Sequence, residues 1–262
     1  MERLSRSNLT YFYLIIFLFS FLFFNSCFAE NKVSIQKQGN QKCILSNGTP
    51  NHDIGQFPVK GNPNRFRPQS LKYCFPFKPL KNNFSTNKAK TIGITLTGIP
   101  IRPGTADWYD ASSPRKHSRD RSSGWNLEAI TPHGNVFGID HNNAHVDNRG
   151  LYHYHGMPSK LINFENKTLV GFAADGHEIH YIGTKVKSSW VIKSGERKSE
   201  PYGNFDGSYL QDYKFEEGSG TLDKCNGGNF NGKFVYFATE EFPFFPRCHW
   251  GNVSSDFSRR GG

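Results

Sequence analysis

The sequence has almost no helical periodicity, because apolar residues seldom recur at the three-to-four-residue spacing of an amphipathic helix. It also has no internal repeat and no low-complexity linker. The one candidate helix, Trp125–Ile130, is too short to carry an architecture. These absences argue against a helical fold and against a division of the chain into several domains.

Several functional motifs are missing as well. No serine stands in a Gly-flanked nucleophile elbow, and no cysteine pair has the two-to-four-residue spacing of a zinc site. No recognisable nucleic-acid-binding module is present, and no stripe of basic and aromatic residues replaces one. We therefore expect no covalent hydrolase mechanism, no cysteine-based zinc site, no nucleotide cofactor and no nucleic-acid partner.

Only one long apolar run occurs, Tyr11–Phe24. Arg3 and Arg6 precede it, and the small residues of Cys27–Ala29 follow it. The run is shorter than the roughly 20 residues of a membrane span, so residues 1–29 are predicted to be a secretory signal peptide. We expect a secreted protein, periplasmic or extracellular, that comprises residues 30–262 and has no transmembrane segment.

Acidic residues are in the minority, with 22 Asp and Glu against 32 Lys and Arg, which gives a formal net charge of +10. The basic residues are dispersed, and their densest patch, Arg115–Arg121, is typical of a solvated loop. A basic surface favours anionic partners. An anionic extracellular polymer or a cell-wall glycan is therefore the expected class of partner.

Four cysteines remain after residues 1–29, an even number that indicates two disulfides in an exported chain. Three connectivities are open. We prefer Cys43–Cys74 and Cys225–Cys248, since each pair brackets one terminal segment.

Short runs rich in Ile, Val, Phe, Tyr and Thr, separated by Gly, Pro, Asn and Asp, indicate β-strands. These runs are Thr91–Thr97, Val136–Ile139, Leu151–His155, Thr168–Ala173, Glu178–Ile182, Trp190–Ile192 and Lys233–Ala238. The sequence therefore predicts a mainly β fold: a single sandwich-like or barrel-like domain over residues 30–262, with long loops and little helix.

Histidines concentrate in one short region, where four of the ten fall between His141 and His155. Side chains alternate along a strand, so His153 and His155 are expected on one face and Tyr152 and Tyr154 on the other. A single histidine is usually structural. Two neighbouring imidazoles, however, gain nothing for packing and repel each other when protonated, which favours a functional role.

A hairpin would add a third imidazole to this pair. Asn148–Gly150 is turn material, and an antiparallel strand over Asn143–Val146 would place His145 across from the tandem histidines. Three histidines with an open fourth position form a ligand set that suits zinc or copper. Asp140 and Asp147 are candidates for orienting an imidazole, although Asp140 is equally suited to capping the turn.

The sequence around these histidines resembles the YHYH protein family, which is named for the tetrapeptide Tyr152–His155. The resemblance continues through Asn47–His52, Gly55–Pro58, Gly61–Asn64, Leu96–Ile101, Asn143–His145, His153–Gly156, Ala174–Gly176, Asp206–Tyr213, Leu222–Gly227 and Phe242–Arg247. It implies an exported protein, and it supplies no catalytic role, because no activity is established for the family.

The resemblance also ranks the histidines. The family pattern has His at His52, His145, His153 and His155, and usually shows other residues at His141, His177, His180 and His249. His52 is therefore the candidate for a fourth metal ligand, brought in from elsewhere in the fold.

Three functions remain open at this point. The leading hypothesis is an exported domain that binds copper or zinc through the histidine cluster, with catalytic use undecided. The second is a metal-independent hydrolase or lyase that acts on an extracellular polymer, with a histidine as general base and Tyr152 or Tyr154 as proton donor. The third is a non-catalytic module that binds a glycan or a protein. Aromatic residues and the paired acids Asp206 and Asp212 offer a possible sugar site in Tyr202–Glu216.

Overall fold

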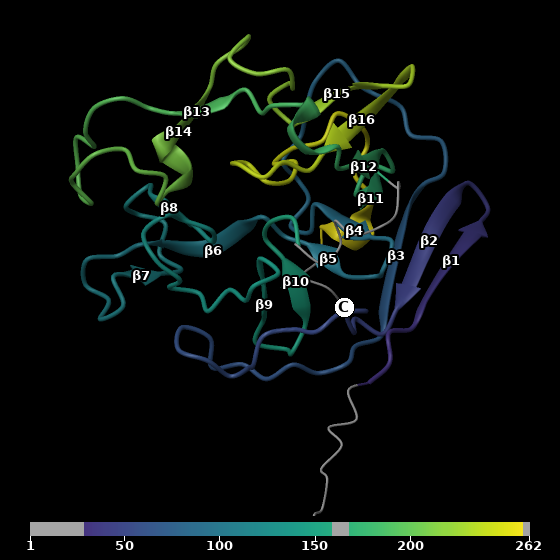
Figure 1. Ribbon diagram of the computed structural model, residues 1–262, viewed down its shortest axis with the longest axis horizontal. Coiled ribbons are helices and arrows are strands. Elements are labelled where there is room, and N and C mark those ends of the chain that lie inside the picture. The colour runs from purple at the N-terminus through teal and green to yellow at the C-terminus, as the bar shows by residue number, and fades with distance from the viewer. Residues whose placement is uncertain (1–28, 159–167, 259–262) are drawn as a thin grey trace, which may run out of the picture.

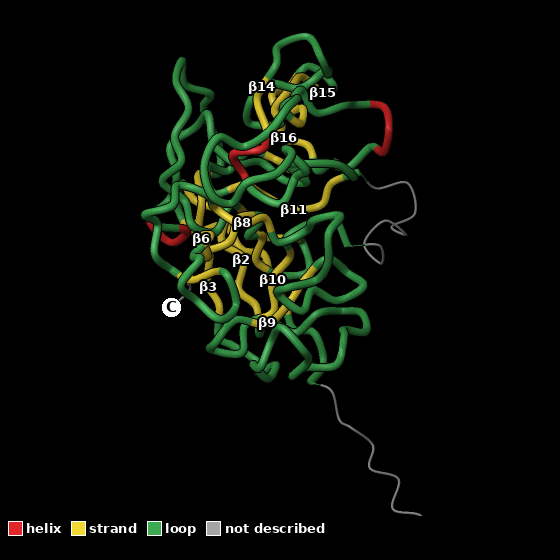
Figure 2. Tube along the Cα trace, turned by 90° about the vertical axis from the view of Figure 1, so that its left-hand side faces the viewer, coloured by secondary structure: helices red, strands yellow, loops and turns green. Residues whose placement is uncertain are grey.

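The computed structural model describes residues 29–158 and 168–258 (Figure 1). Most of the described chain is loop, as Figure 2 shows, and its regular structure is almost entirely β-strand. Helical structure in these ranges is limited to the 3-10 turns Gly183–Lys185 (η2), Leu210–Asp212 (η3) and Ser255–Phe257 (η4). The predicted mainly β fold is thus confirmed, while the predicted signal peptide lies outside the described residues except for Ala29.

The largest sheet of the described chain has eight strands. In spatial order they are β15 (Gly227–Phe230), β16 (Lys233–Phe237), β12 (Glu178–His180), β11 (Leu169–Ala173), β4 (Gly93–Thr95), β5 (Pro100–Ile101), β10 (Tyr152–Tyr154) and β9 (Ala144–Val146). The β5–β10 and β12–β16 pairs are parallel, and the others are antiparallel. Within the described ranges the outer strands β15 and β9 do not pair, so the sheet is open and no barrel closes.

Smaller sheets surround it (Figure 1). One consists of β1 (Val33–Gln38), β2 (Gln41–Ser46) and β3 (Leu71–Pro76). Another has the order β7 (His117–Ser118), β6 (Gly104–Tyr109) and β8 (Asn126–Glu128), and a third pairs β13 (Trp190–Ile192) with β14 (Tyr213–Phe215).

One face of the large sheet is packed into the main core where β5, β10 and β9 run side by side. Tyr154 pairs with Ile101 on one side and Ala144 on the other, and Tyr152 pairs with Val146. All five side chains are fully buried in one cluster. Complete burial of an aliphatic or aromatic side chain contributes about 1.5–3 kcal/mol, so this face holds β10 in a fixed register.

The opposite face is covered in part by the β1–β2–β3 sheet. Ile94 and Phe172 of the large sheet pack against Ile44 and Phe75, and the rings of Phe75 and Phe172 stack with centroids 5.0 Å apart. This region is sandwich-like, because the apolar faces of two sheets meet. The part of the same face that β9 and β10 form carries His145 and His153.

Both preferred disulfides are present. Cys43 and Cys74 lie opposite each other in β2 and β3, and Cys225 is bonded to Cys248. The bonds join residues separated by 31 and 23 positions. Closing loops of this length in the unfolded chain stabilises the fold by about 3–4 kcal/mol each in the chain-entropy model.

Two predicted elements were wrong. The helix expected over Trp125–Ile130 is instead strand β8, in which Asn126 and Glu128 are buried and Leu127 between them is only partly buried. The strand expected over Val136–Ile139 is a turn. The Asn135 side chain closes this turn by accepting from the amide of Ile139 and donating to its carbonyl, both at 2.6 Å, which competes with strand pairing.

Candidate metal centre

A β-hairpin positions the first two histidines, as the sequence predicts. Strands β9 and β10 are antiparallel, and His145 lies directly opposite His153. The connecting turn is held by the Asp147 carboxylate, which accepts from the amides of Arg149 and Leu151 at 2.9 and 3.1 Å. Gly150 has a φ of +89°, a backbone conformation that residues other than glycine rarely adopt.

The third histidine follows at the end of β10. The amide of His155 donates to the carbonyl of Asn143 at 2.8 Å, which continues the pairing with the β9 side of the hairpin. The Nε2 atom of His155 lies 3.1 Å from that of His153 and 3.2 Å from that of His145. His153 and His155 are 4% and 2% exposed, and His145 is partly exposed. Three imidazoles thus meet in a largely buried cluster.

Backbone carbonyls orient all three rings. The Nδ1 atom of His145 lies 2.9 Å from the carbonyl of Phe137, that of His153 lies 3.2 Å from Leu151, and that of His155 lies 3.4 Å from Pro103. A carbonyl only accepts, so we assign the proton of each neutral ring to Nδ1. Each Nε2 then carries a lone pair, and the three lone pairs converge on one point.

The surroundings keep the rings neutral. Burial lowers the pKa of His153 and His155 well below the ordinary histidine value, and the neighbouring imidazoles and Arg102 lower it further. The pKa of His145 is lowered as well, chiefly by burial, although the Phe137 carbonyl opposes the shift. At neutral pH the rings are therefore unprotonated at Nε2, the form that can bind a metal ion.

The cluster has the dimensions of a metal site. A zinc ion bound at about 2.0–2.1 Å by tetrahedrally arranged nitrogens holds them about 3.3 Å apart. The two Nε2 separations of 3.1 and 3.2 Å are close to that value, and all three ligand atoms lie within 4.8 Å of one another. Three imidazoles leave one coordination position open, a donor set suited to zinc or copper.

His52 does not join this cluster. Its Nε2 atom lies 2.5 Å from the hydroxyl of Tyr154, and its Nδ1 atom lies 2.8 Å from the Asp53 carbonyl. Tyr154 projects from the opposite face of β10, so the strand separates His52 from the three imidazoles. The expectation of His52 as a fourth ligand was wrong, because the loop that carries it lies against the tyrosine face.

The candidate orienting acids contact other groups. Asp140 accepts from the amide of Asn142 at 2.9 Å and from the hydroxyl of Tyr152 at 2.7 Å, so it caps the turn before β9. Asp147 forms an ion pair with Arg102 at 3.0 Å. Carbonyls, rather than these carboxylates, fix the imidazoles. A backbone carbonyl leaves no mark in the pattern of side chains. Phe137 and Pro103 were therefore not identified from the sequence as residues that orient the imidazoles.

The paired acids of Tyr202–Glu216, Asp206 and Asp212, form ion pairs with the buried side chain of Arg197. Arg197 donates to Asp212 at 2.6 and 2.9 Å and to Asp206 at 2.5 Å. Asp212 is fully buried and also accepts from the amide of Gly207 at 3.0 Å. This arrangement is a structural ion-pair network, and it offers no freely accessible pair of carboxylates for glycosidic chemistry.

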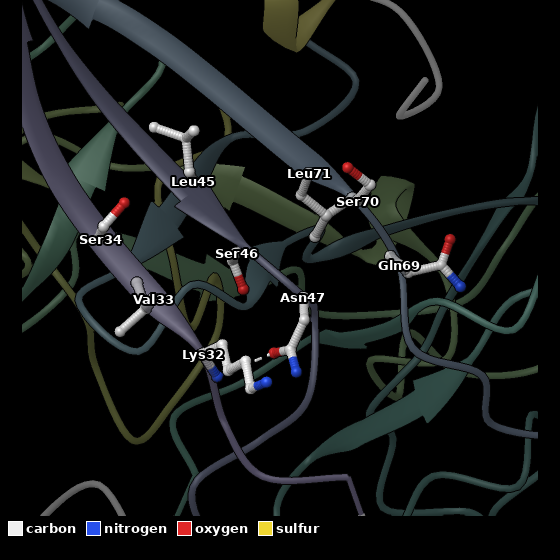
Figure 3. Close-up of a pocket in the computed structure, with 9 residues that line it drawn as sticks. All are labelled: Lys32, Val33, Ser34, Leu45, Ser46, Asn47, Gln69, Ser70 and Leu71. Atoms are coloured by element: carbon white, nitrogen blue, oxygen red, sulfur yellow. Dashed lines mark hydrogen bonds between the residues drawn. The ribbon is translucent and has the colours of Figure 1, made fainter.

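A surface pocket is located away from the histidines, on the β1–β2–β3 sheet (Figure 3). Its lining is made of short polar and apolar side chains with one lysine: Lys32, Val33, Ser34, Leu45, Ser46, Asn47, Gln69, Ser70 and Leu71. Asn47 accepts from the amide of Lys32 at 3.0 Å. The pocket contains no histidine, acid or thiol, and we assign it no chemical role.

Comparison with known proteins gave one kind of match. A family model described as YHYH protein matches residues 72–251, a range that contains the three clustered histidines. The resemblance noted in the sequence is thereby confirmed, although its segments before residue 72 lie outside the matched range. Neither the curated proteins nor the solved structures gave a match. In the residues described, no helix is long and apolar enough to cross a membrane.

Proposed function

The chain belongs to the YHYH family, and we propose that it is an exported protein that binds a transition-metal ion, copper or zinc, through His145, His153 and His155. One observation carries the proposal. Each ring has its Nδ1 atom on a backbone carbonyl and turns its Nε2 atom toward the other two. In this arrangement the carbonyl contacts fix the tautomer that binds a metal ion.

The energetics of the cluster favour a cation at its centre. An acceptor that is buried without a partner costs about 1–3 kcal/mol. In the tautomers assigned above, His153 and His155 turn such atoms toward each other at 3.1 Å, and neither ring has a hydrogen there to donate. If the proton of one ring moved from Nδ1 to Nε2, that ring could no longer donate a hydrogen bond to its backbone carbonyl. A metal ion satisfies all three lone pairs at once.

Export is supported by the disulfides. Bonds such as Cys43–Cys74 and Cys225–Cys248 persist in oxidising compartments and are rare in the cytosol. A protein that folds after export takes up its metal ion outside the cytosol. A preformed, largely buried three-histidine set suits that task, because the ligands need little rearrangement on binding.

The tyrosine face gives no support to a metal-independent hydrolase or lyase. Tyr152 and Tyr154 are both fully buried, and burial raises the pKa of each above its ordinary value. A polymer could not reach their hydroxyls, which are engaged by Asp140 and His52. We therefore give the tyrosines a structural role, in holding β10 so that the histidines face the other way.

Metal analysis tests the proposal. The protein, purified without an affinity tag, is expected to contain about one copper or zinc ion per chain. The double variant His153→Ala/His155→Ala is expected to contain none. His133→Ala removes an exposed histidine, 54% exposed at its side chain, and serves as the matched control that keeps its metal. Equal metal content in the wild type and the double variant would overturn the proposal.

A further inference from the structure

We propose that Arg102 and the open coordination position of the three-histidine site together bind a small carboxylate or other oxyanion. The inference rests on the proposed function, because the anion bridges the metal ion and the guanidinium. It adds a ligand class that the histidines alone do not specify.

The register of the sheet places Arg102 on the histidine face. Strand β5 runs parallel to β10 with Ile101 opposite Tyr154, and the amide of Arg102 donates to the Tyr154 carbonyl at 2.8 Å. Ile101 and Tyr154 both enter the core. Because side chains alternate along a strand, Arg102 emerges on the other face, which it shares with His153 and His155.

Electrostatic coupling agrees with this placement. After burial, the positive charge of Arg102 is among the causes that lower the pKa values of His145, His153 and His155. Geometry supports it as well, because the carbonyl of Pro103, the residue that follows Arg102, lies 3.4 Å from Nδ1 of His155.

The guanidinium has one group that its structural contacts leave unused. Nε donates to the Thr91 hydroxyl at 3.0 Å, and Nη1 donates to the Asp147 carboxylate at 3.0 Å. Nη2 is buried and has no hydrogen-bond partner among the residues that the structure describes. A buried donor without an acceptor costs about 1–3 kcal/mol. The ion pair with Asp147 explains the position of Arg102, and it does not explain the free Nη2.

The charge balance of a loaded site calls for an anion. A divalent ion bound by three neutral imidazoles keeps its full charge of about +2, since none of the ligands is anionic. Arg102 is already neutralised by Asp147, and the nearby Arg247 by the buried Glu128 at 2.7 and 3.1 Å. An oxyanion at the fourth position offsets the metal charge and gives Nη2 an acceptor. The planar fork of arginine suits this contact better than a lysine ammonium does.

The test uses the full mature protein loaded with Co²⁺, whose visible absorption reports its ligands. Acetate and formate are titrated at constant ionic strength, with chloride as the balancing salt. We expect a saturable spectral change in the wild type. Arg102→Gln should weaken acetate binding roughly 10- to 100-fold, the effect of losing a hydrogen bond to a charged group. Co²⁺ affinity should change little, because Arg102 is not a metal ligand.

A further variant sharpens the comparison. Arg102→Lys keeps the charge opposite Asp147 but loses the fork, so its acetate affinity should lie between those of the wild type and Arg102→Gln. If Arg102→Gln fails to fold, Arg102→Lys carries the test.

The outcomes separate this inference from the proposed function. Acetate affinity equal in the wild type and both Arg102 variants, or the lack of any spectral change with acetate, overturns the anion site and leaves metal binding intact. A well-folded wild-type protein that binds no Co²⁺, Zn²⁺ or Cu²⁺ overturns the proposed function and the inference with it.

Discussion

His153 and His155 stand on either side of Tyr154 in the chain, and their Nε2 atoms lie only 3.1 Å apart. The tyrosine between them is fully buried on the opposite face and bonded to His52. The same strand thus anchors its apolar face in the core and turns two imidazoles toward a shared point. Burial of Tyr154 fixes the position of β10, and His153 and His155 are thereby held facing each other.

Loss of any one clustered histidine should strongly weaken metal binding. We expect His145→Ala to raise the dissociation constant for Zn²⁺ by more than the roughly 10- to 100-fold that follows loss of a group that only orients a metal ligand. The partly exposed position of His145 makes misfolding a smaller concern than at His153. Competition with a chromophoric chelator measures the constant, and an unchanged value would count against His145 as a ligand.

Removing the Tyr154 hydroxyl should affect stability and leave metal binding unchanged. Tyr154→Phe takes away the partner of His52 Nε2 and should lower the free energy of unfolding by about 1 kcal/mol. The ligands are on the other face, so Zn²⁺ affinity should match that of the wild type. Urea denaturation and the chelator assay give the two quantities. A large loss of affinity would instead bring the His52–Tyr154 pair into the metal site.

The metal-free protein should lose stability as the pH falls below about 6.5, the ordinary pKa of histidine. Burial lowers the pKa values of His145, His153 and His155 in the folded chain. The unfolded chain then binds more protons than the folded chain, so the free energy of unfolding falls with decreasing pH until the folded values are passed. Urea denaturation between pH 5 and 8 measures the slope.

A variant with fewer clustered imidazoles provides the control for this slope. His153→Gln/His155→Gln removes two of the groups, and its stability should depend less steeply on pH. His133→Ala, which removes an exposed imidazole, should keep the wild-type slope. Identical slopes in all three proteins would show that the cluster does not remain neutral in the folded state.

Loss of the disulfide between the second and third strands should destabilise the fold without altering the ligand set. Cys43→Ala/Cys74→Ala should lower the free energy of unfolding by about 3–4 kcal/mol. Ile44 and Tyr73 beside the bond pack in the same core as Ile94 of β4 and Phe172 of β11. Calorimetry measures the loss, and a variant as stable as the wild type would argue against the bond.

Much of the site follows from local sequence. The two-residue period of a strand places His153 and His155 on one face, and turn residues after Asp147 predict the hairpin that adds His145. Both inferences depend on contacts between residues near one another in the chain. The strands themselves were predicted where β-branched and aromatic residues cluster, as in β16 with Phe234, Val235, Tyr236 and Phe237.

Long-range contacts were beyond the reach of the sequence. His52 and Tyr154 are 102 positions apart, and nothing local indicates which face of β10 the His52 loop covers. The role of Arg102 depends on β5 pairing in parallel with β10, a register that no motif marks. The helix expected at Trp125–Ile130 failed for a similar reason, because pairing of β8 with β6 overrides a weak local preference.

X-ray absorption spectroscopy of the Zn²⁺- or Cu²⁺-loaded protein tests the central claim most directly. The account predicts three imidazole nitrogens at about 2.0–2.1 Å from the ion, with the multiple scattering typical of histidine rings. In His153→Ala/His155→Ala that signal should disappear. A first shell without imidazole, or one that is unchanged in the double variant, would contradict the assignment of His145, His153 and His155 as the metal ligands.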